Sequence, residues 1–112
     1  MNIWNNFQTV DGRQIRFRRK HQSESFAGSP GIYAVTVVRD LEVQALCFHA
    51  ANDLAEADES NLKVKDFYCR LLRHGELGVS VCIMPRSDHV GRAAIALALE
   101  GAINDEERHA AA

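Results

Sequence analysis

Basic side chains are concentrated near the start of this chain. Five of its thirteen Lys and Arg residues lie in the stretch RQIRFRRKH, residues 13–21. Guanidinium and ammonium groups bind phosphates and carboxylates, so this stretch is the first candidate for a function. On a β-strand, side chains two residues apart share a face at a spacing of about 6.6 Å. Arg16, Arg18 and Lys20 would then form a row of cations.

The residues around this stretch predict a β-hairpin. An Asp11-Gly12 pair separates it from IWNNFQTV, and Asp-Gly between alternating runs is a strong hairpin signal. A two-residue loop would mix apolar and charged side chains on both faces. A three-residue loop, with Gly12 left-handed in a bulge, shifts the register by one and separates them. We predict this bulged register, with an apolar face (Ile3, Phe7, Ile15, Phe17) and a polar face (Trp4, Asn6, Gln8, Gln14, Arg16, Arg18, Lys20).

The candidate binding residues of the hairpin are Trp4, Arg16, Arg18, Arg19 and Lys20. Cations of this kind follow the backbone of a nucleic acid while an aromatic ring stacks on a base. Trp and Arg are also the commonest hot spots against a protein partner, here an acidic one. Arg19 falls on the apolar side, so it must end the strand or reach an acid.

Two other interpretations account for the same charge without an external partner. Charged side chains protect exposed edge strands from aggregation, so the row could be a solvated edge. Alternatively, the acidic stretch of the same chain or of a second copy neutralises it, through Asp53, Glu56, Asp58 and Glu59.

A second candidate site lies in MPRSDHVGR, residues 84–92, where a strand is predicted to run into a helix. Free N–H groups and the dipole at a helix start attract anions. The candidate anion site comprises Arg86, Ser87, His89 and Arg92. Asp88 opposes an anion there, and Ser87 as an ordinary helix cap explains the same residues.

Metal binding and catalysis have weaker support. Cys47 and His49 followed by Cys69 and His74 do not have an established zinc spacing, so we predict no metal and no cofactor. Three cysteines in apolar surroundings are interpreted as buried thiols. No nucleotide-binding, metalloprotease or nucleophile motif is present, which favours binding over catalysis. A small enzyme with a Cys/His or anion site stays an alternative.

Other segments predict the elements that hold these residues. GIYAVTVV (31–38) and GVSVCIM (78–84) are apolar strands, and Pro85 closes the second. Ser60 and Gly75 bound a helix with apolar spacing, and Ser87 caps a last helix. Residues 41–57 have two interpretations: an amphipathic helix, or a strand over 41–49 that forms a hairpin with GIYAVTVV, with a helix from Asn52.

The overall composition is that of an ordinary globular domain, 46% hydrophobic and 25% charged. We predict a single domain over residues 1–104 and a frayed tail over 105–112. Residues 1–39 carry a net charge of plus four and residues 40–112 minus six, so the molecule is dipolar. No run is long enough to cross a bilayer and the start lacks signal-peptide features, which predicts a cytoplasmic protein.

Together these patterns predict an α+β fold, with a mostly antiparallel sheet covered by two or three helices. The predicted function is a small binding or regulatory module whose partner is a nucleic acid or an acidic protein. Residues 93–99, AAIALAL, are apolar on every side of the last helix, and such a helix must be covered twice. A homodimer through this helix is therefore the structural alternative.

Overall fold

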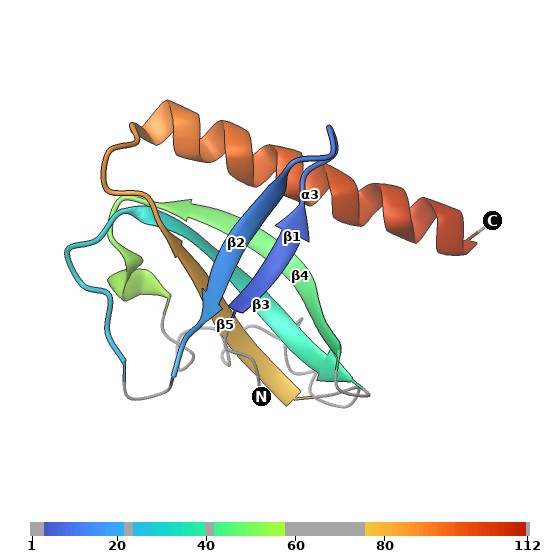
Figure 1. Cartoon of the computed structure of the whole chain (residues 1–112), viewed down its shortest axis with the longest axis horizontal. Coiled ribbons are helices and arrows are strands. Elements are labelled where there is room, and N and C mark those ends of the chain that lie inside the picture. Colours follow the sequence, from blue (N-terminus) through green and yellow to red (C-terminus); the bar gives the residue numbers. More distant parts are fainter. Residues whose placement is uncertain (1–3, 22–23, 40–41, 58–75, 112) are drawn as a thin grey trace.

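The computed structural model of the chain describes residues 4–21, 24–39, 42–57 and 76–111. Its centre is a five-stranded antiparallel sheet in the order β1-β2-β5-β3-β4, curled into a half-barrel. The strands are β1 (Trp4–Gln8), β2 (Gln14–Arg19), β3 (Gly31–Arg39), β4 (Glu42–Ala51) and β5 (Glu76–Ile83). A 3-10 turn, η1 (Leu54–Glu56), follows β4, and the helix α3 (His89–Ala111) follows β5 (Figure 1).

The N-terminal hairpin has the predicted bulged register. Phe7 pairs with Ile15 and Trp4 pairs with Arg18. The Thr9 N–H donates to the Arg13 carbonyl at 2.8 Å, which leaves a three-residue loop. Gly12 in this loop has φ +92°, a left-handed conformation that a side chain would strain. The separation of an apolar from a polar face is confirmed for the described residues of this hairpin, and Ile3 lies outside them.

Residues 42–51 form a strand, so the helical interpretation of this segment is wrong. β4 pairs antiparallel with β3, and the register shifts between Val35 and Thr36, which lie opposite Cys47 and Ala45. Leu46 is therefore an extra residue, a β-bulge. Before the bulge the side chain on the α3 face is at an odd position, Ala45, and after it at the even positions Phe48 and Ala50. Apolar side chains on both sides of such a shift imitate helical spacing. The strand alternative is confirmed, and η1 stands where its helix was expected to begin.

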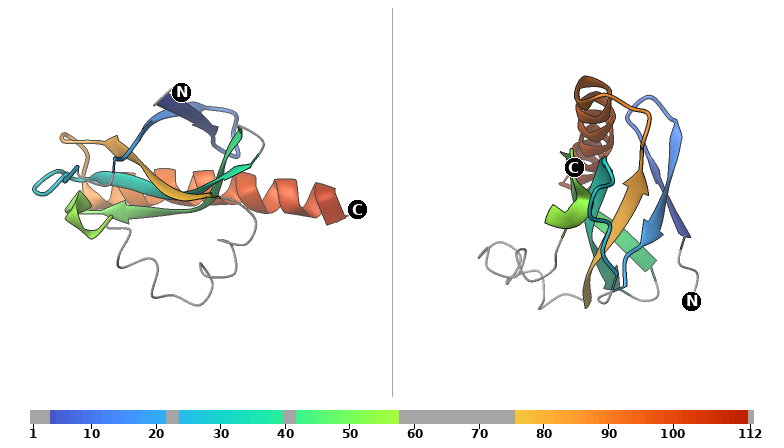
Figure 2. Two further views of the ribbon diagram at one scale, coloured as in Figure 1. Left: turned by 90° about the horizontal axis from the view of Figure 1, so that it is seen from below. Right: turned by 90° about the vertical axis from the view of Figure 1, so that its left-hand side faces the viewer.

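The prediction of two or three covering helices is wrong. The described part of the chain contains one α-helix, α3, which runs across the strands on one face of the sheet (Figures 1 and 2). The predicted helix over residues 60–74 lies outside the described residues. α3 begins at His89, and its cap is Asp88 instead of Ser87, because the Asp88 carboxylate accepts the Gly91 N–H at 2.7 Å.

α3 is covered on one side. Ala96 and Leu99 are buried against the sheet, whereas Val90 and Leu97 are 75% and 74% exposed. The described residues therefore do not supply the second cover that the all-apolar segment led us to expect. Pairing of two copies through this face stays a prediction.

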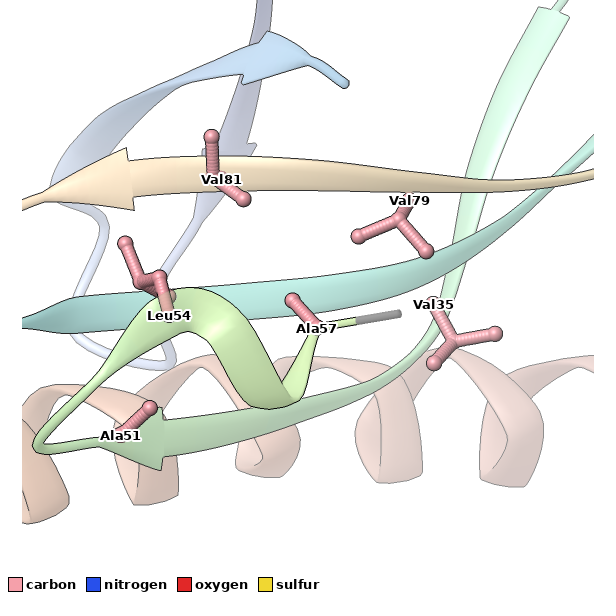
Figure 3. Packing of buried hydrophobic residues seen from close by; sticks show 6 residues of the cluster. All are labelled: Val35, Ala51, Leu54, Ala57, Val79 and Val81. Atoms are coloured by element: carbon pink, nitrogen blue, oxygen red, sulfur yellow. The ribbon is translucent and has the colours of Figure 1, made fainter. Parts of the chain in front are cut away.

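The core has two parts, one on each face of the sheet. On the α3 face, the rings of Phe7, Phe17 and Phe48 lie 5.3 to 5.6 Å apart. On the other face, Leu54 and Ala57 pack on Val35, Val79 and Val81, and Figure 3 shows η1 lying over β3 between β4 and β5. The polar face of the hairpin lies on this second side, opposite α3.

α3 also forms hydrogen bonds at both edges of the sheet. The Phe48 N–H in edge strand β4 donates to Glu100 Oε1 at 2.6 Å. The Val10 N–H, in the loop after edge strand β1, donates to the Ala98 carbonyl at 2.9 Å. Gly101 lies beside this loop, and a Cβ there would be in contact with Val10 Cβ at 3.4 Å. Two positions of one helix, separated by a single residue, thus bridge the two edges of the curled sheet.

None of the helices in the described ranges is long and apolar enough to span a membrane.

Candidate partner-binding surface on the N-terminal hairpin

Arg16 and Trp4 form the centre of the hairpin's polar face. The two residues lie diagonally on β2 and β1, and the Arg16 Cζ is 4.1 Å from the centroid of the Trp4 ring. This is the distance of a cation–π stack. Trp4 is 41% exposed and Arg16 is also exposed. The structure therefore brings together, at the surface, the aromatic group and one of the cations that the sequence predicted.

Arg18 is held by the chain itself. Its Nη2 lies 2.8 Å from Glu24 Oε2, and its Cζ lies 5.8 Å from the centroid of the Phe26 ring. Glu24 also accepts the His21 N–H at 2.9 Å, and this bond, with the Arg18 charge, lowers the Glu24 pKa. Glu24 was missed by the sequence analysis because it lies in a polar loop that no periodicity connects to the hairpin.

The remaining candidates lie at the end of β2. Lys20 donates from Nζ to the His21 carbonyl at 3.3 Å, and Arg19 is the last residue of β2, as one prediction for it required. Arg19 pairs with Ser80 on the α3 face, so it points away from Arg16. The five candidates are therefore divided between the two faces.

The predicted acidic partner of the hairpin is only partly described. Asp53 caps η1 by accepting the Ala55 N–H, and it also accepts the Gly28 N–H, each at 2.9 Å. These bonds lower its pKa. Asp58 and Glu59 lie outside the described residues. Within the described part, the carboxylate that forms an ion pair with a cation on the Trp4 face of the hairpin is that of Glu24, which pairs with Arg18.

The second candidate site is arranged around a buried guanidinium. Arg92 is 5% exposed, and it donates to the Ser87 carbonyl and to Asn52 Oδ1, each at 2.6 Å. Arg86 and His89 are exposed. Asp88 occupies the helix start, so its negative charge stands where an anion would bind. Arg92 holds the β5–α3 connection and the residue after β4 together, and anion binding here stays an untested prediction.

Cys47 and His49 are the members of the Cys/His set considered for metal binding that the structure describes. Cys47 and His49 share one side of β4, as the strand interpretation required, and the His49 ring lies 5.1 Å from that of Tyr33. Among the residues that the structure describes, no three His, Cys, Asp or Glu side chains are grouped to hold a metal ion. Cys69 and His74 lie outside the described residues.

Burial raises the pKa of the Cys82 thiol, which makes it a weak nucleophile.

A small hollow lies next to the Arg18–Glu24 pair. Its volume is about 120 Å³, and its lining includes Lys20, Phe26 and Leu54. Pockets for small organic ligands are typically about 300–1,000 Å³. The hollow is too small for such a ligand. Comparison with protein-family models, curated proteins and solved structures finds no match.

Proposed function

We propose that this protein is a binding module that recognises an acidic segment of a partner protein through the Trp4 face of its hairpin. The observation that carries the proposal is the Arg16 guanidinium held over the exposed Trp4 ring. Trp and Arg together provide the large, partly desolvated contact typical of binding hot spots. In the described part of the chain Arg16 has no carboxylate within salt-bridge distance, so its charge is available to a partner.

A single-stranded nucleic acid is the second candidate, favoured by the same aromatic ring. Bases stack on exposed Trp side chains, and phosphates bind Arg. The row of cations is interrupted, however, because Glu24 neutralises Arg18 between Arg16 and Lys20. An interrupted row follows a regular phosphate backbone poorly, and this favours the acidic protein segment.

A fluorescence-anisotropy titration separates the two candidates. The probes are a labelled eight-residue peptide of alternating Thr and Glu, and a labelled oligothymidine of about 12 nucleotides. We expect the peptide to bind at low salt and the affinity to fall as salt is added. Arg16→Ala and Trp4→Ala should each weaken peptide binding by about tenfold or more.

Arg13→Ala is the matched control for these variants. Arg13 directly follows the hairpin loop, is exposed, and has its own partner in Asp11 at 3.4 Å, so its removal deletes the same charge from the same hairpin. If Arg13→Ala and Arg16→Ala weaken binding equally, net charge and not this surface is responsible. Binding of the oligothymidine alone would replace the protein partner with a nucleic acid.

A further inference from the structure

The outer edge of β1 carries backbone groups that have no partner within the sheet. In an antiparallel pair, residues alternate between those that exchange hydrogen bonds with the neighbour and those whose N–H and C=O point away. The Thr9 N–H bonds to Arg13, so Thr9, Phe7 and Asn5 face β2. The backbone groups of Asn6 and Gln8 therefore point outward from the sheet.

The bonds of neighbouring residues agree with this assignment. The Val10 N–H, next in the outward series, donates to the Ala98 carbonyl of α3 and not to β2. The Lys20 N–H donates to the Val79 carbonyl of β5, so even-numbered residues of β2 face β5 and odd-numbered ones face β1. Within the described residues, α3 thus meets the outward series at Val10 but leaves the edge open at Asn6 and Gln8.

Arg16 places a positive charge above this open edge. It belongs to β2, one strand inward, but its guanidinium lies over the Trp4 ring of β1. Strands in a sheet lie about 4.8 Å apart, so a long side chain that leans outward reaches the next strand added beside β1. The side chains of Asn6 and Gln8 are exposed on the same face. Neither carries a negative charge that would compete for Arg16.

We propose that the acidic partner segment binds as an extended strand, antiparallel to β1, so that the sheet gains a sixth strand at its outer edge. Main-chain bonds to Asn6 and Gln8 provide affinity, and an acidic side chain beside Trp4 pairs with Arg16. The inference rests on the proposed function and specifies its binding mode. A second copy of this chain fits the edge less well, because it would bring another cationic hairpin face to the same side.

Peptides with methylated backbone amides test this mode directly. In an antiparallel pair, the partner residues directly opposite Asn6 and Gln8 bond to them through their own backbone and carry side chains on the same face. In the alternating peptide, these are the Glu residues that face Arg16. Methylating the Glu amides removes their hydrogen bonds to β1. Methylating the Thr amides changes only the outer edge of the bound peptide, which points to solvent. Both modified peptides keep the charge and sequence of the parent.

We expect the Glu-methylated peptide to bind at least about tenfold more weakly than the parent, because two or more main-chain bonds are lost. The Thr-methylated peptide should bind like the parent. If the two methylated peptides have the same affinity as each other, strand addition is wrong even though the surface binds acidic peptides. If the parent peptide does not bind, the proposed function itself fails.

Light scattering of the free protein shows whether a second copy occupies the edge. A dimer that Asn6→Pro breaks would overturn the assignment of an acidic partner.

Discussion

The Phe48 N–H donates to Glu100 Oε1 at 2.6 Å, so a helix carboxylate ends the hydrogen-bond ladder of edge strand β4. The two residues are 52 positions apart in the sequence, with all of β5 between them. An edge N–H exposed to other chains promotes strand pairing and aggregation. At Phe48, the Glu100 side chain of α3 accepts the N–H that would otherwise be able to bond to another strand.

Glu100→Ala should destabilise the protein by about 1–2 kcal/mol, because the partly buried Phe48 N–H loses its acceptor. Glu100→Gln keeps a carbonyl oxygen at the same place and should cost less than about half as much. Urea unfolding followed by circular dichroism measures both values. Equal stability of Glu100→Ala and the parent would mean that solvent replaces this contact.

The outward direction of the Asn6 backbone can be tested by proline, which removes an N–H. Asn6→Pro should be tolerated, since edge strands accept proline where the N–H points to solvent. Asn5→Pro removes an N–H that faces Phe17 in β2 and should destabilise the protein by about 3 kcal/mol or more. Thermal unfolding compares the two variants. If Asn6→Pro is the more damaging, the alternation assigned to β1 is wrong.

Gly31 should tolerate no side chain. A Cβ there would lie 2.2 Å from the Cys82 carbonyl oxygen, which belongs to the backbone of β5 and cannot move alone. We expect Gly31→Ala to cost more than about 3 kcal/mol. Gly78→Ala is the control, since its Cβ would approach the Thr36 Oγ1 at 3.3 Å and a small shift relieves the contact. Similar unfolding midpoints for the two variants would contradict this difference.

Acid should weaken the bonds that Asp53 makes. Its pKa lies below the ordinary 3.8, first because of the Ala55 N–H and then because of the Gly28 N–H. A lowered pKa in the folded state gives stability that is present above the unfolded pKa and is lost as pH falls through the folded pKa. Urea midpoints between about pH 5 and pH 2 should therefore fall less steeply for Asp53→Asn than for the parent. Parallel curves would show that ionised Asp53 does not stabilise the fold.

The elements that follow a local rule were predictable from the sequence. Asp11 and Gly12 define the loop of the hairpin, and alternation on either side defines its register and its two faces. The interpretation of residues 42–51 stayed open because the bulge at Leu46 changes which positions face the core, and this depends on pairing with β3. Long-range pairing has no local signature in a single sequence.

The candidate site was predictable in composition but not in arrangement. Trp4 and Arg16 were expected on one face, whereas their stacking depends on the twist of two strands. The Arg18–Glu24 ion pair depends on how the loop before β3 folds back over the hairpin. The burial of Arg92 likewise depends on packing against Asn52, which is remote in sequence.

The position of β5 determines when this sheet can be completed. β1–β2 and β3–β4 are each hairpins of neighbouring segments, and β5 lies between β2 and β3. Both hairpins are synthesised before residues 76–83, so at that stage neither has its inner neighbour. Since non-local pairing requires closing a long loop first, insertion of β5 is the expected rate-limiting step of folding. Until that insertion, the inner edges of β2 and β3 are open to pairing with other nascent chains.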